Sequence, residues 1–211
     1  VCGYAFDRNV LDEPVSEMGV LSRQFVYHDA EHGGANFLLR NETQPGGQIA
    51  LMDVTQRVGL DANNRRWSLA AAWEDFDNDG DADLYVANDY GRNNLYRNDG
   101  GKFVDVAAEF DVEDSASGMS VTWGDYNLDG RIDLYVSNMF SSAGSRITSQ
   151  PQFKPDASQS VRKRLRRFAR GNTLFRNQQA PWADVSEQSG VTLGRWAWGS
   201  MFVDLNCDGW E

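Results

Sequence analysis

The segment from residue 75 to residue 89, DFDNDGDADLYVAND, places acidic side chains at alternate positions. The acids at the start of this segment are Asp75, Asp77, Asp79, Asp81 and Asp83. Alternate oxygens in a tight loop converge on one point, and Gly80 permits the sharp turn that closes such a loop. A hard cation that takes about six to eight oxygen ligands fits this pattern, which favours Ca²⁺ over Mg²⁺. Because the loop contains no His or Cys, Zn²⁺ is disfavoured.

The same spacing recurs twice later in the chain. With Asp75 as position 1, oxygen-bearing side chains occupy positions 1, 3, 5 and 9, and glycine occupies position 6. The candidate ligands of the later loops are Asp125, Asn127, Asp129, Arg131 and Asp133, then Asp204, Asn206, Asp208 and Trp210. Arg131 and Trp210 stand at position 7, as Asp81 does, so this position is expected to act through its backbone carbonyl. The third loop is expected to bind poorly because its position 9 lies beyond residue 211.

Two other interpretations of the loops compete with a calcium site. An EF-hand needs a bidentate Glu at position 12 and a helix on each side. Position 12 here is Val86 in the first loop and Val136 in the second, and both lie in strand-like sequence. The second alternative is a solvated acidic hairpin loop without metal. Recurrence of the complete pattern favours metal, because carboxylates held this close raise one another's pKa and open the loop unless a cation neutralises them.

The elements that must position these loops come from an internal repeat of about 50 residues. The pattern N-x-L-x-R-N occurs at residues 36–41, 93–98 and 172–177, and each copy is followed by Asp-Val. Repeats are expected at about residues 34–60, 67–112, 119–191 and 196–211, the last one truncated. The third repeat is longer because residues 139–171 form an insertion.

Each repeat reads as four short strands. In the best-preserved copy these are residues 68–76, 82–88, 93–99 and 102–107, with a hairpin signal between the last two. Four short strands in each unit of this length predict an all-β fold, a β-propeller of four-stranded blades. Three to four blades are expected, with the second strand of each buried on both faces. Gly59, Asp111 and Gly190 are expected to close a short turn at positive φ.

The insertion differs from the rest of the chain in composition. Its basic part, residues 160–171, places Val161, Leu165 and Phe168 on one face of a predicted helix. The functional interpretation is a site for an anion or a partner, and the alternative is a helix docked through its apolar stripe. The preceding residues, SSAGSRITSQPQ, predict a mobile loop.

Composition excludes several classes of protein. The net charge of −11 disfavours binding to nucleic acid or to anionic membranes. No apolar run approaches the roughly 20 residues that span a bilayer. Cys2 and Cys207 are too few for a disulfide framework, and they are either a single bridge or two unrelated thiols. The first residue is Val, so the chain is expected to be part of a longer protein with any signal peptide upstream.

These motifs together resemble the FG-GAP/VCBS repeat family, the calcium-loop blades of integrin α-chain propellers. The pattern is D-x-[DN]-x-D-G-x-x-D-L-Y-V after Trp73 or Trp123, followed by N-x-L-[YF]-R-N and D-V. It is most similar to bacterial secreted proteins that carry such repeats before an ASPIC/UnbV segment, related to cartilage acidic protein. The resemblance covers about residues 34–211 and implies a propeller of about seven blades. It also implies Ca²⁺ between the first and second strands of a blade.

The expected function is a non-enzymatic, calcium-stabilised binding or adhesion module. It would bind a protein or polysaccharide ligand through loops on one propeller face. The expected location is extracellular, at the cell surface or periplasmic, in a monomeric part of a larger chain. The alternative is a propeller-fold lyase or hydrolase directed at polysaccharides, with its active site on the axis. No nucleophile elbow, phosphate-binding glycine loop or triad-like arrangement is present in the sequence, so no catalytic residue is assigned.

Overall fold

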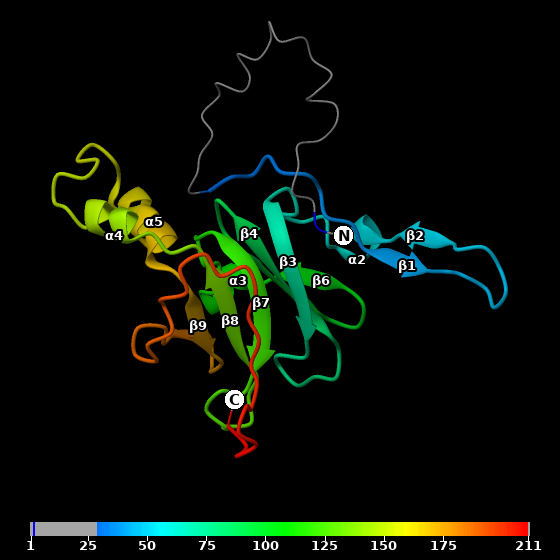
Figure 1. Cartoon of the computed structure of the whole chain (residues 1–211). Helices are drawn as coiled ribbons and strands as arrows, with labels where there is room; N and C mark the ends of the chain where they lie inside the picture. Colours follow the sequence, from blue (N-terminus) through cyan, green and yellow to red (C-terminus); the bar gives the residue numbers. More distant parts are fainter. Residues whose placement is uncertain (1, 3–28, 211) are drawn as a thin grey trace, which may run out of the picture.

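The computed structural model describes residue 2 and residues 29–210, which form antiparallel sheets with a few short helices (Figure 1). One four-stranded sheet contains β3 (Trp67–Glu74), β4 (Asp83–Asp89), β5 (Asn94–Asn98) and β6 (Phe103–Asp105), in that order. The other contains β7 (Gly118–Gly124), β8 (Asp133–Asn138), β9 (Thr173–Arg176) and β10 (Ala183–Asp184). The all-β prediction is confirmed, and each sheet has the strand order of a propeller blade.

A third, two-stranded sheet precedes them, with β1 (Leu39–Asn41) paired to β2 (Leu51–Asp53). These strands carry the sequence that forms the third and fourth strands of the complete sheets. Residues 196–210 form no strand and make one isolated bridge, between Trp196 and Met139. The described residues therefore contain two complete blades of a partial propeller, flanked by parts of two more repeats.

The second strand of a blade is the most buried one, as the sequence predicts. All seven residues of β4 are buried. Its side chains alternate between two apolar clusters, because successive residues of a strand point to opposite faces. Leu84 and Val86 pack with Leu60, whereas Tyr85 and Ala87 pack against the second blade. One strand thus joins both sides of its blade to neighbouring parts of the chain.

The two blades meet through an aromatic cluster. Trp182 makes edge-to-face contacts with Phe76, Phe110 and Trp123 at centroid distances of 5.6, 5.8 and 6.4 Å. Tyr85 packs edge-on against Trp123 at 6.1 Å. Such pairs add about 0.5–1.5 kcal/mol each beyond the area they bury. Trp182, only 4% exposed, is the centre of this interface, although no repeat pattern in the sequence singles it out.

Of the four tryptophans that recur near strand ends, Trp67 is buried and Trp123 packs against the core. Trp73 is 46% exposed and Trp198 is 66% exposed. Two of the four therefore pack within the blades and two are largely exposed. Trp73 still touches its own blade through an edge contact with Phe103 at 5.9 Å.

Short helical turns follow the outer strands and close as predicted. Helix α2 (Thr55–Val58) ends at Gly59 with φ 91°, and helix α3 (Ala107–Phe110) ends at Asp111 with φ 58°. The corresponding turn after β10 ends at Gly190 with φ 69°. At Gly59 a Cβ would also lie 2.6 Å from the carbonyl oxygen of Phe103, so glycine is required there for close approach as well.

The insertion folds into two helices, α4 (Ser142–Thr148) and α5 (Gln159–Arg170). The predicted basic helix is confirmed as α5. The prediction of a mobile loop before it is wrong, because Ser141 caps α4 by accepting a hydrogen bond from the amide of Gly144. Gly144 also lets α4 approach α5 closely, since a Cβ there would lie 3.0 Å from Cβ of Ala169.

Part of the apolar stripe of α5 contacts the first blade. Phe168 stacks on Tyr90 with centroids 6.1 Å apart and planes at 18°. Val161 and Leu165 on the same face are half-buried. The docked-helix interpretation therefore accounts for this face of α5.

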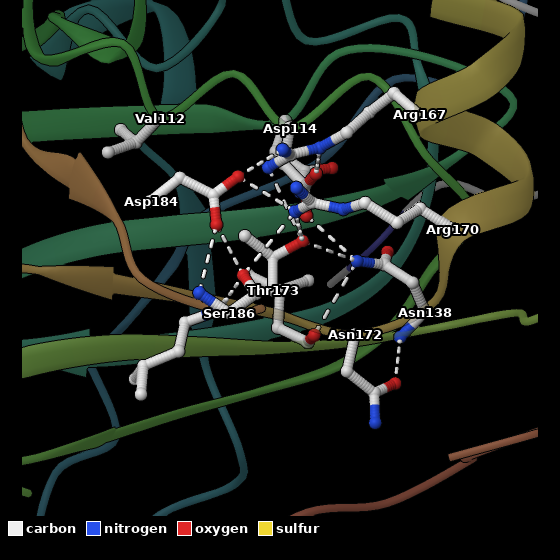
Figure 2. Close-up of polar contacts among 12 residues, drawn as sticks. Val112, Asp114, Asn138, Arg167, Arg170, Asn172, Thr173, Asp184 and Ser186 are labelled. Carbon is white, nitrogen blue, oxygen red and sulfur yellow. Dashed lines mark hydrogen bonds and ion pairs between the residues drawn. The ribbon is translucent and has the colours of Figure 1, made fainter. Parts of the chain in front are cut away.

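Ion pairs, one of them to a fully buried carboxylate, fix the C-terminal half of α5 to the second blade (Figure 2). Arg167 pairs with Asp114 and Asp184, and Arg170 pairs with Asp184 at 2.7 Å. The side chain of Asp114 is fully buried. Burial opposes the ionised form of Asp184, but the charges and hydrogen bonds of Arg167, Ser186 and Arg170 outweigh it and hold the pKa of Asp184 well below its usual value. Asp184 therefore remains ionised and keeps attracting both arginines.

The two cysteines are free thiols, Cys2 half-buried and Cys207 exposed. The alternative of a bridge between them is not realised in this structure.

We predict that Arg167→Ala lowers the free energy of unfolding by about 3 kcal/mol or more, because it leaves the buried carboxylate of Asp114 without its partner. The matched control is Arg164→Ala, which removes a more exposed pair with Asp29 and should cost less than about 1 kcal/mol. Urea unfolding of the two variants measures the difference. Equal losses would show that the Arg167 pairs do not anchor the helix.

Candidate metal centre

The three acidic loops share one hydrogen-bonding pattern at their first position. Asp75 accepts bonds from the amides of Asp79 and Gly80, both at 3.0 Å. In the second loop Asp125 accepts from Asp129 at 3.0 Å and from Gly130 at 2.7 Å. The position-1 carboxylate therefore closes the loop on itself by binding the amides of positions 5 and 6.

The third loop has the same closure. Asp204 accepts bonds from the amides of Asp208 at 3.1 Å and Gly209 at 2.7 Å. These bonds, the one from Gly209 foremost, lower the pKa of Asp204. The loop geometry is therefore intrinsic to its own residues.

A left-handed residue at position 4 completes the shared backbone. Asn78, Leu128 and Cys207 occupy this position with φ of 59°, 56° and 59°. Gly80 at position 6 has φ 94°, as the sequence predicts for glycine in the sharp turn. The sequence does not indicate the special role of position 4, since only Asn78 is a residue type that favours this conformation.

Position 9 carries a buried carboxylate in the first loop. Asp83 is fully buried at the start of β4. It accepts hydrogen bonds from the amides of Asn98 at 2.8 Å and Phe76 at 3.1 Å. Burial, together with the nearby carboxylates of Asp77 and Asp79, raises its pKa to about 6 against these hydrogen bonds.

The second loop also carries a buried carboxylate at position 9. Asp133 is fully buried, and its Oδ1 accepts a hydrogen bond from the amide of Asn177 at 2.6 Å. Its Oδ2 is buried and meets no donor at good hydrogen-bond geometry in the described part of the chain, although the amide of Tyr126 lies near enough to lower the pKa of the carboxyl. Burial raises the pKa of Asp133 to about 6, and the carboxylates of Asp129 and Asp125 add to the shift. A buried carboxylate that lies beside other acids and has one weakly bonded oxygen fits a cation ligand.

The first loop brings three carboxylates together. Asp75, Asp77 and Asp83 place one oxygen each within 4.8 Å of one another, close enough to share a metal ion. The pKa of Asp77 is raised by burial and by the neighbouring acids Asp79 and Asp75. The pairwise repulsion expected from the sequence is therefore present in this loop.

Two other acids of the first loop are used differently. Asp79 lies outside the group of three, and its Oδ1 accepts the amide of Asp81 at 2.9 Å. The side chain of Asp81 turns away to accept the amide of Gly100 at 2.9 Å. Asp81 can therefore contribute only its backbone carbonyl, as expected for position 7.

In the later loops, position-5 carboxylates form contacts within the loop. Asp129 pairs with Arg131 and accepts a bond from Nδ2 of Asn127 at 3.0 Å. Arg131 also donates to the carbonyl of Asn177 at 3.0 Å. Asp208 accepts from Nδ2 of Asn206 at 2.7 Å and from the amide of exposed Trp210 at 3.0 Å. An ion in either loop would have to displace these amide contacts.

Each acidic loop offers only hard oxygen ligands. The two complete loops connect the first strand of a blade to the second. Their chemistry is charge neutralisation and loop closure. In the part of the chain that the structure describes, no helix is long and apolar enough to cross a bilayer.

Comparison of the sequence with known protein families finds a match that spans the two complete loops. Residues 75–136 match the family described as FG-GAP-like repeat. The match begins at position 1 of the first loop and ends in β8, so it contains both position-9 carboxylates. A search of curated proteins returned no significant match.

We predict that the metal-free protein loses stability as pH rises from 5 to 7, because the buried carboxyls of Asp83 and Asp133 ionise in this range. The folded pKa of Asp133, about 6, lies above the roughly 3.9 of an unfolded Asp, so its contribution is complete below pH 4 and is lost as pH passes 6. Asp133→Asn keeps an acceptor for Asn177 and removes this loss, which we place at about 1 kcal/mol after screening.

The measurement is urea unfolding in chelator across this pH range, with Asp99→Asn, an exposed acid paired to Arg97, as the control. The wild-type curve should fall more steeply than that of Asp133→Asn and run parallel to that of Asp99→Asn. Parallel curves for wild type and Asp133→Asn would contradict the prediction.

Proposed function

We propose that this FG-GAP repeat protein, with its family match at residues 75–136, is a calcium-stabilised, non-enzymatic interaction module. The observation that carries the proposal is the buried carboxylate of Asp133, which lies beside the acidic side chains of Asp125 and Asp129 and is paired with no cation among the described residues. A second observation is the convergence of Asp75, Asp77 and Asp83 in the first loop.

Calcium fits these donors better than other common ions. The side chains at positions 1, 3, 5 and 9 supply carboxylate or amide oxygens, and position 7 supplies a carbonyl. Ca²⁺ accepts such mixed oxygen ligands with flexible geometry, whereas Mg²⁺ keeps more water and demands near-octahedral geometry. Ions are expected in the first and second loops.

The effect of the ion would reach beyond the loop. Asp83 links the first loop to the third strand through the amide of Asn98, and Asp133 does the same through Asn177. A cation that neutralises either carboxylate removes the cost of a buried charge and leaves these hydrogen bonds in place. The proposed role is therefore structural: calcium holds the first three strands of a blade in register.

The calcium affinity expected of such loops supports a location outside the cytoplasm. Extracellular calcium modules bind at about 10⁻⁴ to 10⁻³ M, which suits calcium outside the cell. We therefore place the module in the extracellular space, at the cell surface or in the periplasm. Its partners would be proteins or polysaccharides bound by loops on the rigid blades.

We predict that Asp79→Ala lowers the melting temperature by about 5 °C in 10 mM Ca²⁺ and changes it little in chelator. The variant removes an oxygen from the first loop, and ligand linkage at about 10–100 times Kd contributes about 1.4–2.7 kcal/mol. Calorimetry with and without calcium measures the difference. The control is Asp61→Ala, an exposed acid outside the loops. If Asp79→Ala and Asp61→Ala melt alike in calcium, the ligand assignment is wrong.

A second prediction concerns stoichiometry. Titration calorimetry should detect two calcium sites in the wild type and one in Asp133→Asn, because the variant removes the buried carboxylate of the second loop only. Retention of both sites would exclude Asp133 as a ligand, and a wild type without heat of binding would exclude the calcium proposal.

A further inference from the structure

The cations of helix α5 fall into two groups. In the first, Arg164 pairs with Asp29, and Arg167 and Arg170 pair with Asp184. These residues recur every three positions along one side of the helix, and Arg167 and Arg170 fasten it to the second blade (Figure 2). Carboxylates of the same chain compensate their positive charge.

The second group is Arg162, Lys163 and Arg166. Within residue 2 and residues 29–210, none of the three forms an ion pair with a carboxylate. Arg166 is held in place by a hydrogen bond from its Nε to the carbonyl of Thr148 at 3.0 Å, so α4 orients it. A docked helix needs none of these charges, so docking does not explain them.

These three side chains line a continuous groove. One cavity of about 790 Å³ lies between α4 and α5, and a second of about 630 Å³ lies along the first turns of α5. Ser160, Lys163 and Arg166 line both cavities, which makes them parts of one groove. Gln159 and Arg162 complete the second cavity, which has no acidic lining residue.

The acids of the first cavity lie mostly in ion pairs. Asp114 and Asp184 pair with arginines of α5, and Glu113 pairs with Arg92 at 3.3 Å. Asp111 and Glu187 also line this cavity. The positive potential is therefore strongest at the other end, where the amino-terminal turns of α5 add the positive pole of the helix dipole.

We propose that this groove binds a linear acidic polysaccharide through Arg162, Lys163 and Arg166. Two joined cavities exceed the size of a single oxyanion, so the ligand is an extended chain with repeated negative charges. Phe140 is the one large apolar side chain in the lining, whereas the core of a protein interface is rich in aromatic and apolar anchors. Hydroxyl and amide side chains beside the cations suit sugar hydroxyls and carboxylate or sulfate groups.

This inference rests on the proposed function as an interaction module but not on calcium. Strand β8 starts at Asp133 in the second calcium loop and ends at Asn138, where the insertion begins. The groove and the calcium loop therefore lie at opposite ends of the strand (Figure 1). Each can fail separately.

The test is binding of the full chain to heparin in 2 mM Ca²⁺, measured by titration at several salt concentrations. The variant is Arg162→Gln/Lys163→Gln/Arg166→Gln. The matched control, Arg40→Gln/Arg57→Gln/Lys102→Gln, removes the same charge from exposed cations around β1, α2 and β6. We expect at least a tenfold loss of affinity in the groove variant, little loss in the control, and weaker wild-type binding as salt rises.

Further probes decide the ligand class. Neutral dextran should not bind, and polyglutamate and duplex DNA should bind more weakly than heparin. Tighter binding of polyglutamate or DNA overturns the polysaccharide assignment, as does an equal affinity of the groove variant and the control. If the wild type does not bind heparin but still melts higher in calcium, the groove inference fails and the calcium proposal stands.

Discussion

One buried carboxylate in each complete loop connects the features of the blade. Asp83 and Asp133 begin the second strand, terminate the acidic loop and accept the amide of an asparagine at the end of the third strand. A residue in this position cannot be both buried and charged at low cost without a partner, since burial penalises the ionised form. The raised pKa values of Asp83 and Asp133 reflect that conflict, and a cation bound in the loop would resolve it. The acidic loop and the sheet are therefore one electrostatic unit.

In the insertion it is positive charges that are partly buried, and carboxylates of the protein compensate them. Arg167 and Arg170 enter the protein and are matched by Asp114 and Asp184, so the helix is anchored by paired charges. The remaining cations stay at the surface, on a chain whose net charge is −11. A long-range attraction between these cations and the acidic surface would be screened beyond about 8–10 Å at physiological salt. The cationic groove can therefore keep its own potential on an acidic protein.

Much of the fold was predictable because the repeat carries its structure locally. Alternation, the D-G turn and the N-x-L-x-R-N pattern specify strands and turns over a few residues, and the positive φ at Gly59 and Gly190 follows from the same local chemistry. The central role of Trp182 was not predictable, since its partners Phe76 and Trp123 come from the two different blades. Helix α4 was missed because its stability depends on the cap at Ser141 and on contact with α5 rather than on periodicity.

The sequence alone determined which oxygens could surround a cation and how far apart they stand along the chain, because a tight loop limits where each side chain can point. Only the tertiary structure decided which of these oxygens form good hydrogen bonds within the protein. Oδ2 of Asp133 is weakly bonded because β8 is buried in its sheet. The side chain of Asp81 points away from the loop because it accepts a hydrogen bond from the amide of Gly100 in the next hairpin. It also divided the arginines of α5 into paired and free ones, since their carboxylates lie on strands and loops far away in the sequence. Burial and pairing are properties of neighbours in space, which spacing along a chain does not contain.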